Sequence, residues 1–80
     1  GRVEQRAASV VPEWMQCPIT LTLMYDPVVA SDGHTYERHA IRRHWRTAGT
    51  SPLTREPLQS AVFDNRALAT AIDAWLEKEA

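Results

Sequence analysis

Residues 28–49 read VVASDGHTYERHAIRRHWRTAG, and this stretch carries the clearest local signals of structure in the chain. The pair Asp32-Gly33 lies between residues that favour β-structure, which is a strong short-range signal for a two-stranded hairpin. Residues 37–48 contain no proline or glycine, begin with an acidic residue and are followed by Gly49. The stretch therefore predicts a short β-hairpin followed by a central helix.

The segments that flank this stretch predict two ordered loops. Between residues 14 and 24 apolar side chains are frequent, but Pro18 interrupts any helix, so we expect a loop packed on the core. Residues 49–57 are rich in Gly, Ser, Thr and Pro, and two prolines forbid a continuous helix there. We expect this second connection to be a structured loop as well.

The two ends of the chain differ in pattern. Near the C-terminus, Asp64-Asn65 offers a helix cap, and the apolar residues that follow recur at helical spacing: Leu68, Ile72, Trp75 and Leu76. This pattern predicts a C-terminal amphipathic helix. At the N-terminus no apolar stripe persists, so residues 1–11 are expected to be a linker or extension, and residues 12–78 to form one domain.

The supply of metal-binding side chains limits how so small a domain is held together. The chain holds a single cysteine, Cys17, which excludes an internal disulfide and any structural zinc site built on two or more thiolates. Its histidines lie five residues apart, so on a helix neighbouring rings would diverge by roughly 140°. We therefore expect no metal and no cofactor, with a His-only zinc site as the weaker alternative.

Charge and hydropathy argue against two broad classes of partner. Nine Lys and Arg against ten Asp and Glu leave the chain near neutrality, without a long run of one sign to follow a phosphate backbone. No apolar stretch approaches the ~20 residues that cross a bilayer, and no secretion signal is visible. We expect no nucleic acid and no membrane as partner, and a reducing compartment, cytoplasmic or nuclear.

The order and spacing of many residues between positions 12 and 77 closely resemble the U-box family. The matching residues are Cys17-Pro18-Ile19-Thr20, Met24, Asp26-Pro27-Val28, Asp32-Gly33-His34-Thr35-Tyr36-Glu37-Arg38, Ile41, Pro52-Leu53-Thr54, Pro57-Leu58, Asn65, Leu68, Ile72 and Trp75-Leu76. Matches in one order over so much of the chain are far more specific than any single short pattern. One departure is a connection about one residue shorter before Pro52, which makes the pairing of His44 and Trp45 with family positions ambiguous.

The resemblance implies an α+β, RING-like U-box fold with a hairpin, a central helix, two ordered loops and a C-terminal helix. In this family polar contacts take the place of the zinc ions of RING domains. The candidates for that structural polar network are Asp32, His34, Tyr36, Arg38, Thr54 and Asn65. Ordinary turn and cap roles remain open for Asp32 and Asn65.

The resemblance also implies a surface for a ubiquitin-conjugating enzyme between the two loops and the central helix. Its candidate residues are Ile19, Pro52, Leu53 and Trp45, with His44 as the alternative to Trp45. A purely structural core role stays open for Ile19 and Trp45. Arg55 resembles the arginine that bridges the conjugating enzyme and its linked ubiquitin, and is the candidate catalytic residue, since a guanidinium fork can bond two proteins at once.

The function implied is that of a ubiquitin-protein ligase module, which promotes transfer of ubiquitin from a charged conjugating enzyme to a substrate lysine. Three alternatives remain at this stage. The first is a U-box-like adaptor without transfer activity, the second a covalent enzyme that uses Cys17, and the third a small nucleic-acid binder. The substrate is unknown, and a homodimer is left open.

Overall fold

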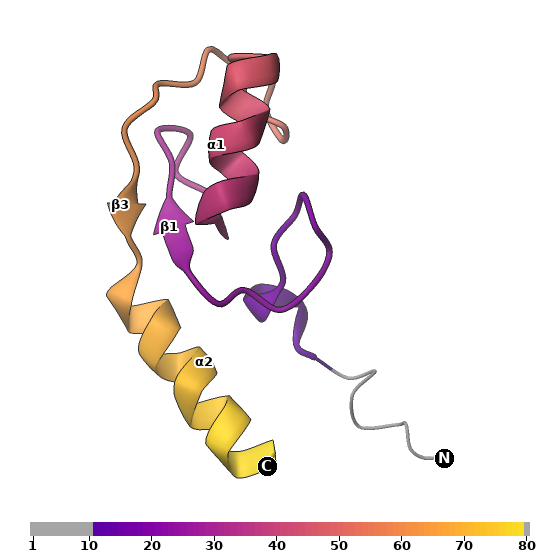
Figure 1. Ribbon diagram of the computed structural model, residues 1–80, viewed down its shortest axis with the longest axis vertical. Helices are drawn as coiled ribbons and strands as arrows, with labels where there is room; N and C mark the ends of the chain where they lie inside the picture. Colours follow the sequence, from indigo (N-terminus) through magenta and orange to yellow (C-terminus); the bar gives the residue numbers. More distant parts are fainter. Residues whose placement is uncertain (1–10, 80) are drawn as a thin grey trace.

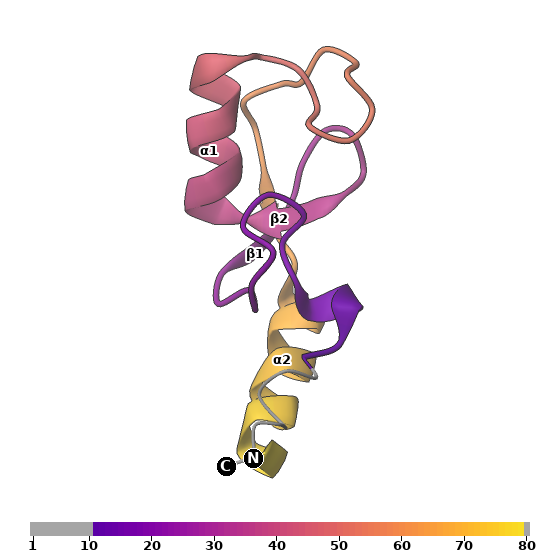
Figure 2. The ribbon, with the colours of Figure 1, turned by 90° about the vertical axis from the view of Figure 1, so that its right-hand side faces the viewer.

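The computed structural model describes residues 11–79, so the predicted linker over residues 1–11 lies almost entirely outside the described residues. A three-stranded antiparallel sheet has the order β2-β1-β3, with a helix beside it and a second helix that extends away from it (Figure 1, Figure 2). The elements are a 3₁₀ turn η2 (Glu13–Met15), β1 (Pro27–Val29), β2 (Thr35–Glu37), α1 (Arg38–Thr47), β3 (Phe63–Asp64) and α2 (Arg66–Glu79). The predicted α+β, RING-like class is confirmed.

The hairpin of β1 and β2 turns at the predicted Asp-Gly pair. Val28 pairs with Tyr36 in antiparallel register, and both side chains are fully buried. The turn is closed by the amide of Ala30, which donates to the carbonyl of His34 at 3.0 Å. Gly33 has a φ of 84°, in the left-handed region that side chains other than glycine rarely adopt. The hairpin therefore depends on glycine at this position.

Helix α1 begins one residue later than predicted, because Glu37 is the last residue of β2 and its side chain makes no cap hydrogen bond. The helix buries Ala40 and Ile41 against the sheet. It ends as predicted, since the amide of Ala48 donates to the carbonyl of His44 at 2.8 Å and Gly49 follows with a φ of 72°.

Strand β3 was not predicted and pairs with the outer edge of β1, with Val28 opposite Asp64 and Val29 opposite Phe63. It leads directly into α2. Asn65 caps that helix, since its side-chain oxygen accepts the amide of Leu68 at 3.1 Å. No helix within residues 11–79 is long and apolar enough to cross a membrane.

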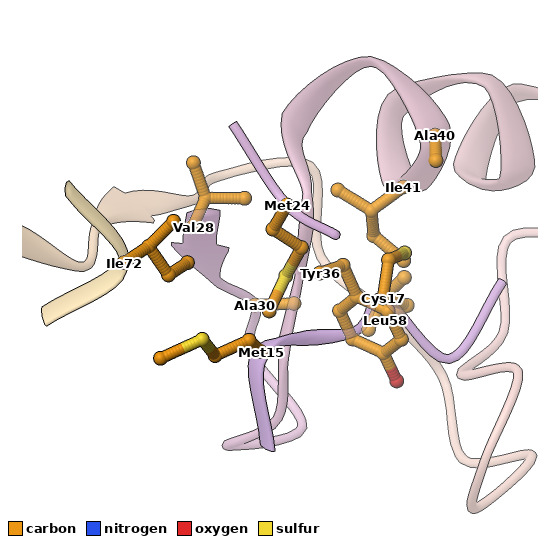
Figure 3. Close-up of a cluster of buried hydrophobic side chains, with 10 residues drawn as sticks. All are labelled: Met15, Cys17, Met24, Val28, Ala30, Tyr36, Ala40, Ile41, Leu58 and Ile72. Carbon is orange, nitrogen blue, oxygen red and sulfur yellow. The ribbon is translucent and has the colours of Figure 1, made fainter. Parts of the chain in front are cut away.

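A single hydrophobic core joins the loops, the sheet and both helices (Figure 3). Its buried members are Met15, Cys17, Met24, Val28, Ala30, Tyr36, Ala40, Ile41, Leu58 and Ile72. Half-buried residues of α2 pack against it from below the sheet, including Leu68 and Trp75. Burying a large apolar side chain contributes about 1.5–3 kcal/mol, so this cluster holds the flanking loops as well as the sheet.

Candidate functional site

Loop 1 (residues 17–24) is tied to the sheet through the thiol of Cys17. The backbone of the loop folds on itself, since the amide of Cys17 donates to the carbonyl of Thr22 at 2.9 Å. The buried sulfur accepts the amide of Ile19 at 3.4 Å and the amide of Glu37 at 3.3 Å. Because Glu37 is the last residue of β2, the sulfur joins the start of loop 1 to that strand.

The carboxylate of Glu37 holds the far side of loop 1, where the chain turns into β1. One of its oxygens, Oε1, accepts the amide of Tyr25 at 2.8 Å and the amide of Asp26 at 3.2 Å. Hydrogen bonds to a charged acceptor are stronger than those between neutral groups. Glu37 therefore acts as a clamp between β2 and the end of loop 1, in place of the helix-start role that its sequence position indicates.

Loop 2 (residues 49–57) is organised by the hydroxyl of Ser51, which is only 2% exposed. This hydroxyl donates to Oδ2 of Asp32 at 2.7 Å. It also accepts the amides of Leu53 at 3.0 Å and Thr54 at 2.9 Å. One buried oxygen thus makes three hydrogen bonds, and it joins the hairpin turn to the tip of loop 2.

The carboxylate of Asp32 is the centre of this arrangement. Its Oδ2 also accepts the hydroxyl of Tyr36 at 2.6 Å, and its Oδ1 accepts the amide of His34 at 2.8 Å. Burial alone would raise the pKa of Asp32, but the hydrogen bonds from Tyr36, Ser51 and His34 outweigh it and lower the pKa. Burial and the bond donated to Asp32 raise the pKa of Tyr36. We call Asp32, Tyr36 and Ser51 the Asp32 network.

The two loops are consequently fixed to consecutive residues of one strand. Tyr36 reaches loop 2 through the Asp32 network, while Glu37 holds loop 1 through its amide and its carboxylate. Both Tyr36 and Cys17 belong to the buried core (Figure 3). A strand anchored in that core therefore sets the position of each loop relative to the other.

Arg38 makes a second, separate polar cluster at the start of α1. Its guanidinium donates to Asp26 from Nε at 2.7 Å and from Nη2 at 3.3 Å, and it also pairs with Asp64 of β3. The hydrogen bond from Arg38 lowers the pKa of Asp26, and both carboxylates raise the pKa of Arg38. The carboxylates are half exposed, so the cluster orients the helix start and contributes modestly to stability.

The predicted polar residues thus fall into different places. Asp32 and Tyr36 bond to each other, and Thr54 joins them through its backbone amide. Asn65 caps α2 and donates from Nδ2 to the hydroxyl of Thr35 at 3.1 Å. His34, like Thr54, contributes only its backbone amide to the Asp32 network, and its exposed side chain makes no hydrogen bond within residues 11–79.

Ser51, Glu37 and the sulfur of Cys17 are structural anchors that were not predicted from the sequence. A serine directly before Pro52, in a loop rich in Gly, Ser, Thr and Pro, is typical of a turn that a side-chain hydroxyl closes, and this pattern was present at Ser51. Within residues 11–79, no three side chains among His, Cys, Asp and Glu come together to hold a metal ion.

Apolar side chains are exposed on the two loops. Leu21 at the tip of loop 1 is 72% exposed, and Leu53 of loop 2 is 49% exposed. Ile19 and Pro52 are half-buried beside them in sequence. Leu21, which the sequence analysis did not single out, has a φ of 59°, and a left-handed backbone at leucine costs about 1–2 kcal/mol. Its exposure and its strain were not detectable from composition or periodicity.

Besides Leu21, Arg55 is the one non-glycine residue within residues 11–79 that has a left-handed backbone. Its φ is 69°, and its amide donates to the carbonyl of Ser51 at 2.9 Å. The side chain is exposed and forms no ion pair within the described part of the chain. The loop backbone that Ser51 holds therefore presents a guanidinium to solvent next to Leu53 and Thr54.

His44 and Trp45 lie on different sides of α1. Nε2 of His44 lies 2.7 Å from the carbonyl oxygen of Thr50, at the start of loop 2. The indole of Trp45 donates to the carbonyl of Leu58 at 2.6 Å, and the segment that follows Leu58 runs along the side of α1 opposite loop 1 (Figure 1). The structure thus places His44 against the start of loop 2 and Trp45 against Leu58, which follows the end of that loop.

Comparisons with known proteins agree with this architecture. The sequence model of the U-box domain matches residues 11–80. WD repeat, SAM and U-box domain-containing protein 1 of Homo sapiens is 48% identical over 73 residues, which cover 88% of this chain and 15% of that protein. E3 ubiquitin-protein ligase CHIP of Arabidopsis thaliana is 40% identical over 77 residues, which cover 94% of this chain and 28% of that protein.

Similarity to a solved structure supports the assignment of the fold, and of the fold alone. The RING finger-like domain of retinoblastoma binding protein 6 superposes with a TM-score of 0.74 at 24% identity, over 81% of this chain and 76% of that domain's chain. The matched region is only a small part of the two curated relatives, so their full-length activities are not carried over to it. The family match over nearly the whole chain, together with the RING-like fold, shows that this chain belongs to the U-box domain family.

Proposed function

We propose that this chain binds a ubiquitin-charged conjugating enzyme and promotes transfer of ubiquitin to a substrate lysine, without carrying ubiquitin itself. One relative over the same region is named an E3 ubiquitin-protein ligase. The observation that carries the proposal is the attachment of both loops to consecutive residues of β2, Tyr36 and Glu37. Two loops held in this way offer a partner one preformed surface, so little ordering entropy is lost on binding.

The proposed contact surface is apolar and belongs to both loops. Leu21 and Leu53 expose large side chains, and Ile19 and Pro52 add half-buried apolar area. Exposed apolar clusters on a small domain mark interaction sites. Residues with a strained backbone, such as Leu21, are more frequent at functional sites than elsewhere in proteins. A surface built on four apolar side chains is small compared with most protein interfaces, so we expect modest affinity.

Arg55 is proposed to bond the conjugating enzyme and its linked ubiquitin at the same time. The guanidinium carries five donors in a rigid fork, which suits simultaneous bonds to two proteins. Its exposure and its position beside Leu53 in loop 2 support this role. Such a bridge would favour one arrangement of the thioester-linked pair.

The proposed mechanism needs no nucleophile in this chain. Cys17, the single cysteine, is 0% exposed and its sulfur accepts two backbone hydrogen bonds, which argues against a covalent ubiquitin intermediate. The thioester already holds the chemical energy for transfer. Restricting ubiquitin to orientations open to attack by a lysine amine raises the rate, because less orientational entropy is lost at the transition state.

Two substitutions separate binding from activation. Ile19→Ala removes apolar contact area and should weaken affinity for the conjugating enzyme by roughly 5- to 30-fold, since truncating a central apolar contact costs about 1–2 kcal/mol. Arg55→Ala should leave that affinity nearly unchanged and slow ubiquitin discharge to free lysine by about tenfold or more, since it removes charge-assisted bonds. Titration calorimetry and a single-turnover discharge assay measure the two effects separately.

Matched controls lie outside the loops. Phe63→Ala removes an exposed apolar side chain from β3, and Arg66→Ala removes an exposed cation from α2, and both should leave binding and discharge at the wild-type level. Equal losses of binding in Ile19→Ala and Arg55→Ala would contradict the proposed division of roles. A wild-type chain that binds conjugating enzymes without accelerating discharge would instead support the adaptor alternative.

A further inference from the structure

The outer face of α1 carries a row of basic residues that the proposed ligase surface does not use. His39, Arg42, Arg43 and Arg46 follow the spacing i, i+3, i+4, i+7, so their side chains share one face of the helix. We call these four residues the Arg ridge. Helix α1 contains no acidic residue, and like charges at this spacing destabilise a helix. A stretch of this kind is therefore unfavourable for folding unless something outside the helix compensates for it.

Carboxylates of the described chain do not pair with the three arginines of the ridge, although Oε2 of Glu37 lies 3.8 Å from Nδ1 of His39. Within residues 11–79, no Asp or Glu oxygen lies within 4.0 Å of a guanidinium nitrogen of Arg42, Arg43 or Arg46. The nearby carboxylate of Asp26 is bonded to Arg38 instead. Three guanidiniums thus remain available to an anion from another molecule, although the chain as a whole is nearly neutral.

Two hollows flank the ridge. The first, of about 300 Å³, is lined by Asp26, Arg38 and the four ridge residues. The second, of about 350 Å³, lies between α1 and the segment after loop 2; Ile41, Trp45, Leu58 and Val62 form its apolar wall, and Arg42, Arg46, Gln59 and Ser60 complete its lining. Arg42 and Arg46 line both hollows, so they form the boundary between the basic hollow and the one that has an apolar wall.

We propose that this face docks an acidic peptide segment of a partner protein, with one large apolar side chain in the Trp45 hollow and neighbouring anionic groups on Arg42 and Arg46. The half-exposed indole of Trp45 offers an apolar wall, and its N–H is already bonded to Leu58. The ridge from His39 to Arg46 is roughly 10 Å long at 1.5 Å per residue, which matches about three residues of extended chain.

The observations favour a peptide over a membrane or a nucleic acid. Both hollows are concave, and one has an apolar wall that includes Trp45, whereas a phosphate backbone presents no apolar group to pack on that wall. This docking surface is separate from the loops and does not depend on the proposed ligase function.

Fluorescence anisotropy with the whole chain tests the proposal. The probe is a fluorescein-labelled peptide containing Glu-Glu-Phe-Glu-Glu, with a second version in which phosphoserine replaces the inner glutamates, so that carboxylate and phosphate are compared. We expect binding that weakens as salt screens the charges, and at least about tenfold weaker binding in Arg42→Glu/Arg46→Glu, which reverses two charge-assisted contacts. A peptide with serine in place of phenylalanine should also bind more weakly.

Controls keep the outcome unambiguous. Arg66→Glu changes the charge by the same amount per site on α2 and should alter binding less than twofold, and Arg42→Gln/Arg46→Gln replaces the double reversal if that variant misfolds. Absence of binding at millimolar peptide, equal loss in Arg66→Glu, or tighter binding to anionic vesicles or single-stranded DNA than to either peptide would overturn the proposal. Ubiquitin discharge is measured in parallel, and its failure with peptide binding intact would count against the ligase proposal alone.

Discussion

Replacing Ser51 by alanine removes three hydrogen bonds from one buried oxygen. The bond to Asp32, at 2.7 Å, has a charged acceptor and is worth about 1.5–3 kcal/mol, and each of the two amide bonds contributes roughly 1 kcal/mol. Water can reach the amides of Leu53 and Thr54 once the hydroxyl is gone, because both residues are exposed. We therefore expect the free energy of unfolding to fall by about 3 kcal/mol.

That loss is large for a domain of this size. At about 0.05–0.15 kcal/mol per residue, a chain of 80 residues has roughly 4–12 kcal/mol of stability in total. Urea unfolding followed by tryptophan fluorescence measures the change, and an unchanged dependence on urea concentration shows that the difference lies in stability. Ser60→Ala is the matched control, because Ser60 is exposed and makes no hydrogen bond within residues 11–79.

A loss below about 0.5 kcal/mol in Ser51→Ala, or an equal loss in Ser60→Ala, would refute the reasoning, since surface substitutions commonly fall in that range. Hydrogen exchange tests the same reasoning at the level of single backbone amides. Hydrogen exchange at Leu53 and Thr54 should accelerate more than exchange in β1, because their acceptor is the atom that has been removed.

Three further predictions concern pH, the thiol and the strained loop. The pKa of Asp32 is lower in the folded state than its unfolded value, near 3.8, so the ionised carboxylate stabilises the fold above that pH. This stabilisation is lost as pH falls through the folded-state pKa. The free energy of unfolding, measured as a function of pH, should show this loss in the wild-type chain and a flatter pH dependence in Asp32→Asn. Cys17→Ser should retain most of the discharge activity and should have a lower unfolding midpoint, because it places a hydroxyl at a buried site. A non-reducing gel should show no ubiquitin thioester on the wild-type chain. Loss of activity in a folded Cys17→Ser protein would instead support the covalent alternative. Arg55→Gly should be about 1 kcal/mol more stable than Arg55→Ala, because glycine accepts the left-handed backbone, and yet equally slow in discharge; a fast Arg55→Gly variant would mean that the side chain has no bridging role.

The elements with strong local signals were predictable from the sequence. The hairpin follows from Asp32-Gly33, the end of α1 from Gly49 and the start of α2 from Asn65, and in each case the residue acts within its own turn. Strand β3 had no such signal. It is two residues long, both side chains are exposed, and it exists only through pairing with β1, which lies far away in the sequence.

The same distinction separates the predicted from the unpredicted parts of the candidate site. Ser51 bonds to Asp32 across 19 positions of sequence, and no local pattern identifies that partner. Helical periodicity placed His44 and Trp45 on α1, but it does not say which neighbouring segment covers which face. That assignment required the path of the chain after Leu58, which lies against Trp45.

The most direct test of the account is the rate of ubiquitin discharge from a charged conjugating enzyme to free lysine, measured with the wild-type chain, Ser51→Ala and Ser60→Ala, each with EDTA and with added zinc. We expect the wild-type and Ser60→Ala rates to be equal in both conditions, and Ser51→Ala to be slower than its folded fraction explains. Discharge that disappears in EDTA, or a fully folded Ser51→Ala protein that works at the wild-type rate, would contradict the claim that side-chain hydrogen bonds set the two loops for this partner.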